Sequence, residues 1–159
     1  VPSRGLIGFR TEFLTNTKGT GIANAISAGY DAWAGDIVTR NNGSLIADRA
    51  GVVTPFAMIG LQERGSFFVQ PTSEVYAGMV IGENSRAGDL CVNVTKTKKL
   101  TNMRASGSDD KVRLAPPKVF SLEECLEYIQ SDEYVEVTPK SLRIRKILLK
   151  ETDRKRSGK

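Results

Sequence analysis

The sequence predicts an α+β protein that is β-rich over most of its length, with antiparallel meander or barrel-like strands and one amphipathic helix. Short strand-like runs separated by turn residues fill the chain from Asp36 onward. Residues 121–130 instead place apolar side chains at helical spacing. One helix and one strand precede residue 35, and such a pair cannot form a core alone. We therefore expect a partial domain at 1–34, cut from something longer, and a second domain at 35–159.

The first helix is expected over residues 3–18. Ser3 can cap it, apolar residues of "GLIGFRTEFL" fall near one broad face, and Gly19 ends it after Lys18. The next segment, "TGIANAISAGY", alternates weakly around Ile22 and Ile26. It is predicted to be a strand that runs to Tyr30.

A β-meander is predicted next. The runs "DIVTR", "SLIAD" and "VVTPFAMIGL" are separated by a tight turn at Asn42 and Gly43 and a second turn at Gly51, and Asn-Gly between strand-like runs is a strong hairpin signal. Three more strands are expected in "SFFV", "GMVIGEN" and "LCVNV".

The segment "SLEECLEYIQ" gives the clearest helical pattern. Ser121 and Glu124 form a capping box, and an apolar stripe follows at positions i, i+3, i+4 and i+7, namely Leu122, Cys125, Leu126 and Ile129. We expect this stripe to pack into the β core. "EYVEVT" and "SLRIRKILL" then alternate as strands, and the charged tail at 150–159 is expected to be a frayed helix.

The composition is that of a soluble globular protein, with 40% hydrophobic and 26% charged residues. No apolar run approaches the roughly 18 residues of a membrane-spanning helix, and the first residues do not form a signal peptide. We therefore expect a cytoplasmic protein. The two cysteines, Cys91 and Cys125, are isolated in the sequence and are expected to be buried free thiols.

Charge is segregated along the chain, although the net charge is only +5. Residues 121–136 contain six acids and no base, whereas residues 140–159 contain nine bases and two acids. A polyanion such as nucleic acid is one natural partner for the basic regions. The alternative is a solvated surface in which the acidic region neutralises a basic neighbour.

Residues 95–104, "TKTKKLTNMR", contain four cations and no acid. The sequence around them has no sustained period, so residues 95–113 are predicted to be a basic loop. The decapeptide has no aromatic residue on which a base could stack and no histidine for acid-base chemistry. Its chemistry is therefore positive charge alone.

No enzymatic site is predicted. The chain has no histidine and only two separate cysteines, which excludes histidine-based catalysis, histidine-based metal sites and a zinc site formed by the cysteines. No Gly-rich loop of the phosphate-binding type is present. Isolated catalytic carboxylates stay possible, but no pair is nominated, so the catalytic and metal residues are expected to be none.

Several stretches resemble a known family, and "KKLTNMRAS" and "DEYVEVTP" are the most specific of them. With "VPSRGLIGFRTEFLTNTKGTG", "LQERGSFFV" and "EVYAGMVIGENSR", they look like the C-terminal part of the BipA/TypA family of bacterial ribosome-associated GTPases. The likeness runs from Val1 to Arg156. It implies that residues 1–34 end a ferredoxin-like domain shared with elongation factor G, and that residues 35–159 form the C-terminal domain peculiar to the family.

The resemblance also implies a function. The family binds the ribosome at the translation-factor site, and its C-terminal domain reaches along the A-site tRNA toward the peptidyl-transferase centre, through a loop that corresponds here to Val94–Arg113. The implied partners are 23S rRNA and A-site tRNA. No membrane or DNA partner is implied, and the protein is expected to be monomeric. The implied roles are ribosome assembly, stress response or translation control. GTP and Mg²⁺ would belong to a nucleotide-binding domain outside this chain, so no cofactor is expected in this fragment.

The residues expected to bind RNA follow from the basic loop and its flanks. They are Lys96, Lys98, Lys99, Asn102, Arg104, Lys111, Arg113 and Lys118. Arg143 and Arg145 share one strand face, so they are either further RNA contacts or partners of the acids at 121–136. The alternative for the whole chain is a protein-interaction β domain whose basic loop is merely solvated.

Overall fold

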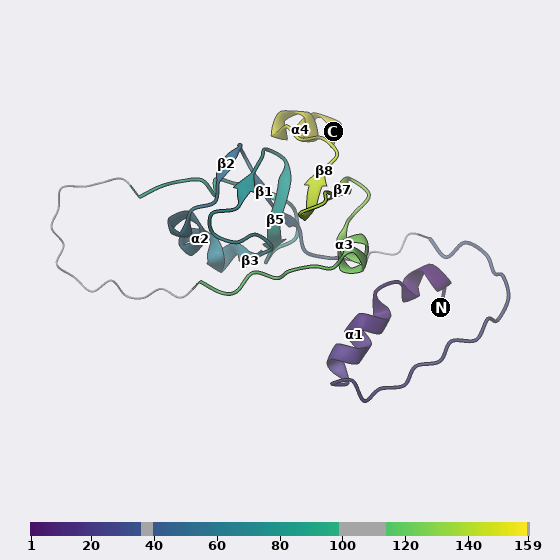
Figure 1. Cartoon of the computed structure of the whole chain (residues 1–159). Helices are drawn as coiled ribbons and strands as arrows, with labels where there is room; N and C mark the ends of the chain where they lie inside the picture. The colour runs from purple at the N-terminus through teal and green to yellow at the C-terminus, as the bar shows by residue number, and fades with distance from the viewer. Residues whose placement is uncertain (36–39, 99–113, 159) are drawn as a thin grey trace. The chain divides into compact units, whose positions relative to one another are not determined.

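The computed structural model describes residues 1–35, 40–98 and 114–158 of the 159-residue chain (Figure 1). The chain divides into two compact units, Val1–Thr39 and Arg40–Lys159. Within these described ranges, no helix combines the length and apolar character needed to cross a bilayer.

The first unit contains a 3₁₀ turn, η1 (Ser3–Leu6), and one helix, α1 (Phe9–Asn16). The single helix predicted from Ser3 is therefore wrong at its start, because Gly8 lies in the left-handed region with φ 82° and interrupts the helical path. Ser3 caps neither element. α1 ends at Asn16, two residues before the predicted end. Gly19 has the left-handed conformation typical of a helix stop, with φ 79°, and its N–H donates to the carbonyl of Leu14 at 2.7 Å.

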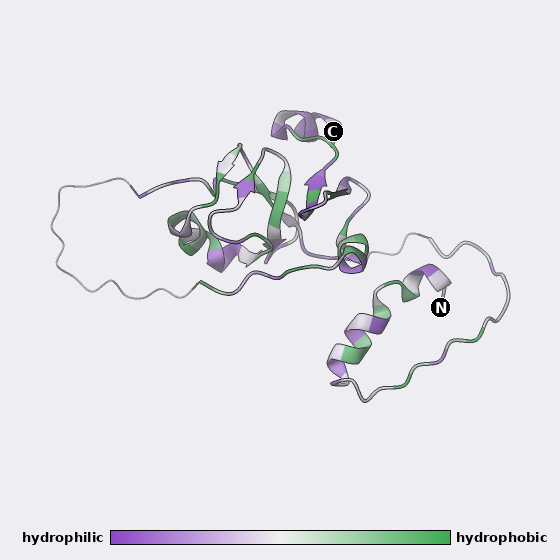
Figure 2. Ribbon diagram, viewed as in Figure 1, coloured by the Kyte–Doolittle hydropathy of each residue, from purple (hydrophilic) through white to green (hydrophobic). Residues whose placement is uncertain are grey.

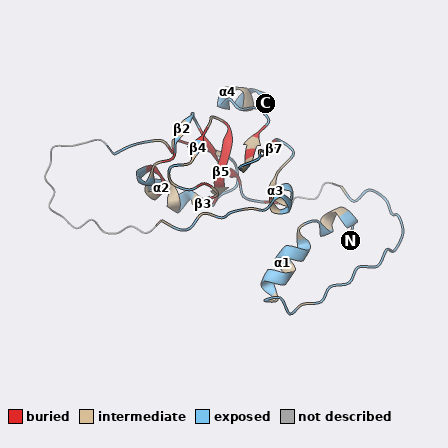
Figure 3. Ribbon diagram, viewed as in Figure 1, coloured by how far each residue is buried: buried red, intermediate tan, exposed pale blue. Residues whose placement is uncertain are grey.

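The strand predicted up to Tyr30 is wrong. Residues 20–35 form no strand, and Ile22 and Ile26 are 87% and 93% exposed. A strand is stabilised by hydrogen bonds to a neighbour, and the part of this unit that the structure describes offers none. No described residue of the unit is buried, and α1 shows only the exposed and intermediate colours in Figure 3.

The second unit is built on a six-stranded open sheet, which confirms the β-rich α+β fold class. The sheet has the order β6-β1-β5-β8-β7, and β3 also pairs with β5. Its strands are β1 (Ser44–Ala47), β3 (Gly65–Phe67), β5 (Met79–Asn84), β6 (Leu90–Val92), β7 (Glu133–Val137) and β8 (Leu142–Lys146). A separate pair joins β2 (Gly51–Val52) to β4 (Glu74–Val75).

The connectivity differs from the predicted meander. β1 pairs antiparallel with β5 and parallel with β6, and not with a strand across the Asn42–Gly43 turn. Gly43 instead allows close backbone approach, because a Cβ at this position would lie 1.8 Å from the carbonyl oxygen of Gly88. Of the predicted strand 36–40, residues 36–39 lie outside the described residues, and Arg40 is a buried residue outside any strand.

A helix replaces most of the strand predicted at 52–61. α2 (Pro55–Leu61) continues into the 3₁₀ turn η2 (Gln62–Arg64). The Thr54 hydroxyl accepts a hydrogen bond from the Ala57 N–H at 3.2 Å, and Pro55 occupies the first turn. This is a standard helix start, so the local signal was present in the sequence and was outweighed by the apolar run.

The core of the second unit lies on both sides of β5, which is buried in Figure 3 and apolar in Figure 2. The larger cluster packs α2 against the sheet through side chains such as Leu45, Met58 and Ile81. The smaller cluster contains Val80, Cys125 and Ile144, with aromatic rings beside them.

The helix predicted at 121–130 is confirmed as α3 (Leu122–Tyr128), with both bonds of the capping box formed. Its buried stripe was only partly predicted. Cys125 is 3% exposed, but Leu122 and Leu126 are 39% and 57% exposed. Ile129 packs against the smaller cluster as predicted, and the buried face is rotated from Leu122 and Leu126 toward Tyr128, which also packs there.

The C-terminal elements agree with the sequence prediction. β7 and β8 form an antiparallel hairpin that pairs Glu133 with Lys146 and Val137 with Leu142. The charged tail forms α4 (Glu151–Ser157). Both cysteines are free as predicted, although Cys91 is only partly buried.

Candidate nucleic-acid interface

Lys96 and Lys98 follow the end of β6, and both side chains are exposed. The backbone before them is well anchored. The Thr54 N–H donates to the Val94 carbonyl at 3.0 Å, and the Thr54 hydroxyl donates to the Lys96 carbonyl. The same hydroxyl caps α2, so the start of the basic segment is tied to the start of that helix.

A local turn adds to this anchoring. The Asn93 side-chain oxygen accepts hydrogen bonds from both the N–H and the hydroxyl of Thr95, each at 3.0 Å. Such side-chain to backbone bonds favour a defined turn over continued pairing. Neither Lys96 nor Lys98 forms an ion pair with another described residue. Their charges are therefore presented to solvent from a fixed base.

Five other predicted contacts lie outside the described residues, so their role stays a prediction. They are Lys99, Asn102, Arg104, Lys111 and Arg113.

Lys118 lies on the far side of the basic segment and is exposed. Its N–H donates to the Phe67 carbonyl at 2.8 Å, which fixes this stretch of chain against the end of β3. Its ammonium lies 4.8 Å from the centroid of the Phe120 ring, within the range of a cation–π contact.

Arg143 and Arg145 have different surroundings on β8. Arg143 Nη1 lies 3.7 Å from Glu136 Oε1, and both side chains are one-third exposed. Arg145 lies over the Tyr134 ring, with Cζ 5.4 Å from its centroid. The neutralising acid is thus on the neighbouring strand, and the pair is too long and too solvated to cancel the charge of Arg143.

Glu136 is shared with Tyr76, whose hydroxyl donates to its other carboxylate oxygen. Burial, followed by this hydrogen bond and the charge of Glu136, raises the pKa of Tyr76 to about 12. Tyr76 is therefore a neutral hydrogen-bond donor at physiological pH. The carboxylate of Glu136 is shared between Tyr76 and Arg143.

The sequence reasoning missed a buried ionic cluster around Lys146, whose residue is only 1% exposed. Lys146 Nζ lies 3.0 Å from Glu133 Oε1 and 2.8 Å from Asp132 Oδ2, and it also pairs with Asp89. Arg40 Nη2 donates to the same Glu133 oxygen at 3.1 Å. We call Arg40, Ser44, Glu133 and Lys146, with Asp89 and Asp132 at the edge, the Lys146 cluster.

Ser44 completes the cluster, because its hydroxyl donates to Glu133 Oε1 at 2.7 Å. Burial alone would raise the pKa of Glu133, but the Ser44 hydroxyl and the charges of Lys146 and Arg40 outweigh it and lower that pKa. Burial likewise opposes ionisation of Lys146, and its carboxylate partners outweigh this and raise its pKa.

The Lys146 cluster is therefore a charged structural element and not a surface for RNA. Lys146 counts among the nine bases of the C-terminal region, yet it is only 1% exposed and its ammonium is held by three carboxylates, so its charge is not presented to a phosphate. The strand alternation carried a signal of this cluster, because Lys146 lies on the same face of β8 as Ile144. If that face is buried, a lysine on it needs carboxylate partners within the core.

A metal centre is not apparent among residues 1–35, 40–98 and 114–158, which contain no group of three or more histidine, cysteine, aspartate or glutamate side chains placed to hold an ion. Within the same ranges, Lys96, Lys98 and Lys118 are exposed and form no ion pair, so the described part of the predicted interface is cationic.

Comparison with known proteins bears on this cationic surface. Residues 42–151 match the family model described as the TypA/BipA C-terminal domain. The chain is 52% identical over its whole length to the protein of Haemophilus influenzae named large ribosomal subunit assembly factor BipA. It is 51% identical over its whole length to the protein of that name from Escherichia coli K12, and 47% identical over 94% of its length to the one from Synechocystis.

The chain spans about a quarter of the length of these relatives. The family match covers most of the second unit, including the sheet, the segment from Lys96 to Lys118 and all of the Lys146 cluster except Arg40. The chain belongs to the TypA/BipA family.

Proposed function

We propose that this chain binds RNA of the large ribosomal subunit, as the C-terminal region of a translational GTPase that acts in subunit assembly. The relatives that it matches are named large ribosomal subunit assembly factors. The observation that carries the proposal is the pair of exposed cations, Lys96 and Lys98, which extend from an anchored turn without ion-pair partners in the described part of the chain.

The proposed contacts are electrostatic. Lys96, Lys98 and Lys118, with Lys99, Arg104, Lys111 and Arg113 of the intervening segment, would lie against phosphates, and Asn102 would donate to a backbone oxygen or a base edge. The proposed RNA partners are 23S rRNA and the A-site tRNA. Arg143 and Arg145 of β8 are further candidate contacts, since Arg143 has only a long, part-exposed pair with Glu136 and Arg145 lies over the Tyr134 ring as Lys118 lies over Phe120.

The proposed role involves no chemical step in this chain. GTP and Mg²⁺ would bind in the part of the relatives that the chain does not span, and this region would supply ribosome affinity. A ribosome partner places the work of the protein in the cytoplasm. We include in the same proposal that the protein acts during stress and in translation control. We also propose that it is monomeric.

Ribosome co-sedimentation tests the proposal. Replacing Lys96, Lys98, Lys99 and Arg104 with alanine should weaken binding to large subunits. The slope of log K against log salt should become shallower by about 0.7–0.9 for each phosphate that is no longer bound. The matched control replaces four exposed cations elsewhere with alanine, namely Arg86, Lys150, Lys155 and Arg156. This control variant loses the same number of positive charges and should retain most of the affinity for large subunits.

Unaltered affinity and salt slope in the first variant would contradict the proposal. The alternative, a protein-interaction β domain with a solvated basic loop, would then be favoured. Equal reductions of affinity in both variants would show that net charge, and not this segment, drives binding.

A further inference from the structure

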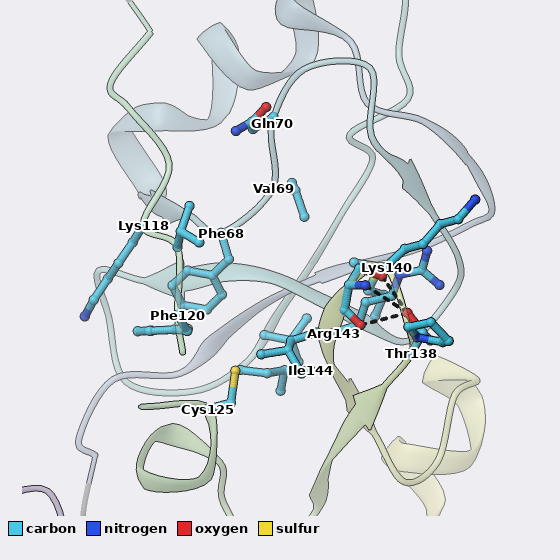
Figure 4. Close-up of a pocket in the computed structure, with 16 residues that line it drawn as sticks. Phe68, Val69, Gln70, Lys118, Phe120, Cys125, Thr138, Lys140, Arg143 and Ile144 are labelled. Atoms are coloured by element: carbon cyan, nitrogen blue, oxygen red, sulfur yellow. Dashed lines mark hydrogen bonds between the residues drawn. The ribbon is translucent and has the colours of Figure 1, made fainter. Parts of the chain in front are cut away.

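The two strands β3 and β8 share one edge of β5. β1 occupies the opposite edge, pairing with Val80, Gly82 and Glu83. On the shared edge, β8 pairs with Met79 and Val80, and β3 pairs with residues 82–84. Beyond this edge, the segment that follows β3 and the turn that precedes β8 lie apart from each other. A pocket of about 710 Å³ lies between them, lined also by residues 118–120 (Figure 4). We call it the β3/β8 pocket.

The inner surface of the pocket belongs to the protein core. Val80, Cys125 and Ile144 line it, and each is at most 4% exposed. Phe68 and Phe120 form an aromatic wall, with ring centroids 4.6 Å apart. Because these side chains are packed in the smaller core cluster, the apolar part of the pocket is already formed without a ligand.

The rim of the pocket is cationic. Lys118 lies on one side, and Lys140 and Arg143 lie on the other (Figure 4). None of the sixteen lining residues is acidic. Neither lysine forms an ion pair within the described ranges, and the Arg143 pair with Glu136 is long and one-third exposed. The rim therefore favours an anion with charge on both sides of the pocket.

The cationic rim is held by the backbone. The turn that carries Lys140 is closed by Thr138 and Ser141, since the Thr138 hydroxyl donates to the Ser141 carbonyl at 2.8 Å and accepts from the Ser141 N–H at 3.0 Å. On the other side, Lys118 is fixed by its bond to Phe67. Preorganised positions of this kind lower the entropy cost of binding.

We propose that the β3/β8 pocket holds one unpaired nucleotide of an RNA strand. The base would lie against Phe120 and the apolar wall, and the phosphates before and after it would contact Lys118 on one side and Lys140 and Arg143 on the other. The exposed amide of Gln70, at the edge of the pocket, has a donor and an acceptor and can pair with a base edge. The inference rests on the proposed function and adds a specific site to it.

The structure favours a nucleotide over an acidic peptide. A pocket of this volume fits a ligand of nucleotide size. A base supplies a flat face for the aromatic wall together with negative charge at both ends, whereas an acidic peptide supplies the charge alone. Duplex RNA keeps its bases paired and stacked, so the proposal predicts a preference for single strands.

The test measures binding of the whole chain to a short unstructured RNA and to a short RNA duplex by fluorescence anisotropy. The pocket variant is Lys140→Ala/Arg143→Ala, and the control Lys150→Ala/Arg156→Ala removes the same charge away from the pocket. The pocket variant should raise the Kd for the single strand at least about tenfold, with little change for the duplex. The control should change neither.

A second measurement locates the strand. RNA with 4-thiouridine at one position should, on irradiation, form a crosslink to the peptide that contains Val119 and Phe120, and Phe120→Leu should reduce that crosslink without unfolding the domain. Crosslinks confined to other peptides would overturn the pocket assignment. Displacement of the RNA by an acidic peptide of equal charge at equal concentration would also overturn it.

The outcomes separate this inference from the proposed function. If the pocket variant binds single strands normally while replacement of Lys96 and Lys98 weakens RNA binding, the pocket assignment fails and the proposed function stands. If the unaltered chain binds neither RNA nor large subunits, both fail.

Discussion

The ammonium of Lys146 lies 3.0 Å from a carboxylate oxygen of Glu133, and the two side chains are 1% and 0% exposed. The register of the β7–β8 hairpin places these residues directly opposite each other. Arg40 and Ser44 bind the same oxygen, so the pair also ties the first residues of the second unit to its last two strands.

Breaking this pair should be costly. Lys146→Met leaves Glu133 buried with less compensation, and removal of one partner of a buried pair typically costs about 3–5 kcal/mol of unfolding free energy. Because Arg40 remains, we expect the lower part of that range in urea unfolding. Lys150→Met, at an exposed site four residues later, serves as the control and should change stability by less than about 0.5 kcal/mol. Equal effects would show that the cluster is solvated.

The same cluster should shape the pH dependence of stability. The folded state lowers the pKa of Glu133 below its ordinary 4.5, so the contribution of Glu133 is present above pH 4.5 and is lost as pH falls through the folded-state pKa. The folded state raises the pKa of Lys146 above 10.5, so its contribution is present below that pH and is lost as pH rises through the folded-state pKa.

Unfolding free energy measured across this range should therefore fall at both ends. Glu133→Gln should flatten the acid limb, in addition to lowering the stability at neutral pH. An acid limb of unchanged slope in this variant would assign the acid sensitivity to other carboxylates.

The orientation of α3 can be tested by comparing a buried residue of the core that it covers with an exposed residue of α3 itself. Ile144 lies in the smaller core cluster at 4% exposure, so Ile144→Ala should cost about 2–5 kcal/mol through reduced burial and a cavity. Leu126 is 57% exposed, and Leu126→Ala should cost less than about 0.5 kcal/mol. Thermal or urea unfolding of the two variants checks the rotation of the α3 face, and a large destabilisation at Leu126 would restore the stripe predicted from spacing alone.

Elements governed by nearby residues were predictable from the sequence. The capping box of Ser121 and the alternation on either side of the Thr138 turn both act within a few residues, and α3 and the β7–β8 hairpin follow from them. The same reasoning failed at α2. There an apolar run was interpreted as a strand, although Thr54 and Pro55 together carried a helix-start signal.

Features that depend on distant contacts were not predictable. The parallel pairing of β1 with β6 joins residues about 45 positions apart, such as Leu45 and Leu90. The β3/β8 pocket likewise depends on where two strands leave a shared edge. Lys118 was expected to be an RNA contact, and Arg143 was expected to be either an RNA contact or a partner of the acids at 121–136. Nothing in the sequence places these two residues around one cavity with Lys140.

Two glycines should respond in opposite ways to alanine. A Cβ at Gly65 would lie 1.8 Å from the backbone carbonyl oxygen of Glu83, so Gly65→Ala should force β3 from β5 and cost at least about 1–3 kcal/mol. A Cβ at Gly60, within α2, meets nothing within 4 Å, and Gly60→Ala should gain about 0.5–1 kcal/mol. Melting temperatures of the two variants should therefore move in opposite directions. A shift of the same sign in both would contradict the β3–β5 register.

The segment between α1 and the second unit should be cut first by chymotrypsin. Tyr30 is fully exposed in a stretch of chain without strand pairing, whereas Trp33 lies under the Arg4 guanidinium, with Arg4 Cζ 3.4 Å from the ring centroid. Cleavage after Tyr30 should precede cleavage after Trp33, and both should precede cleavage after Phe67, which is 6% exposed in the core.

Mass spectrometry of a time course identifies the order of these cuts. Trypsin provides the matched control, because no lysine or arginine lies between Lys18 and Arg40 and this segment should therefore survive it. The fragment that begins after Tyr30 should keep the melting temperature of the whole chain, since no described residue before it is buried. Early cleavage after Phe67, at the rate of cleavage after Tyr30, would mean that the second unit opens as readily as the first and would contradict the core described above.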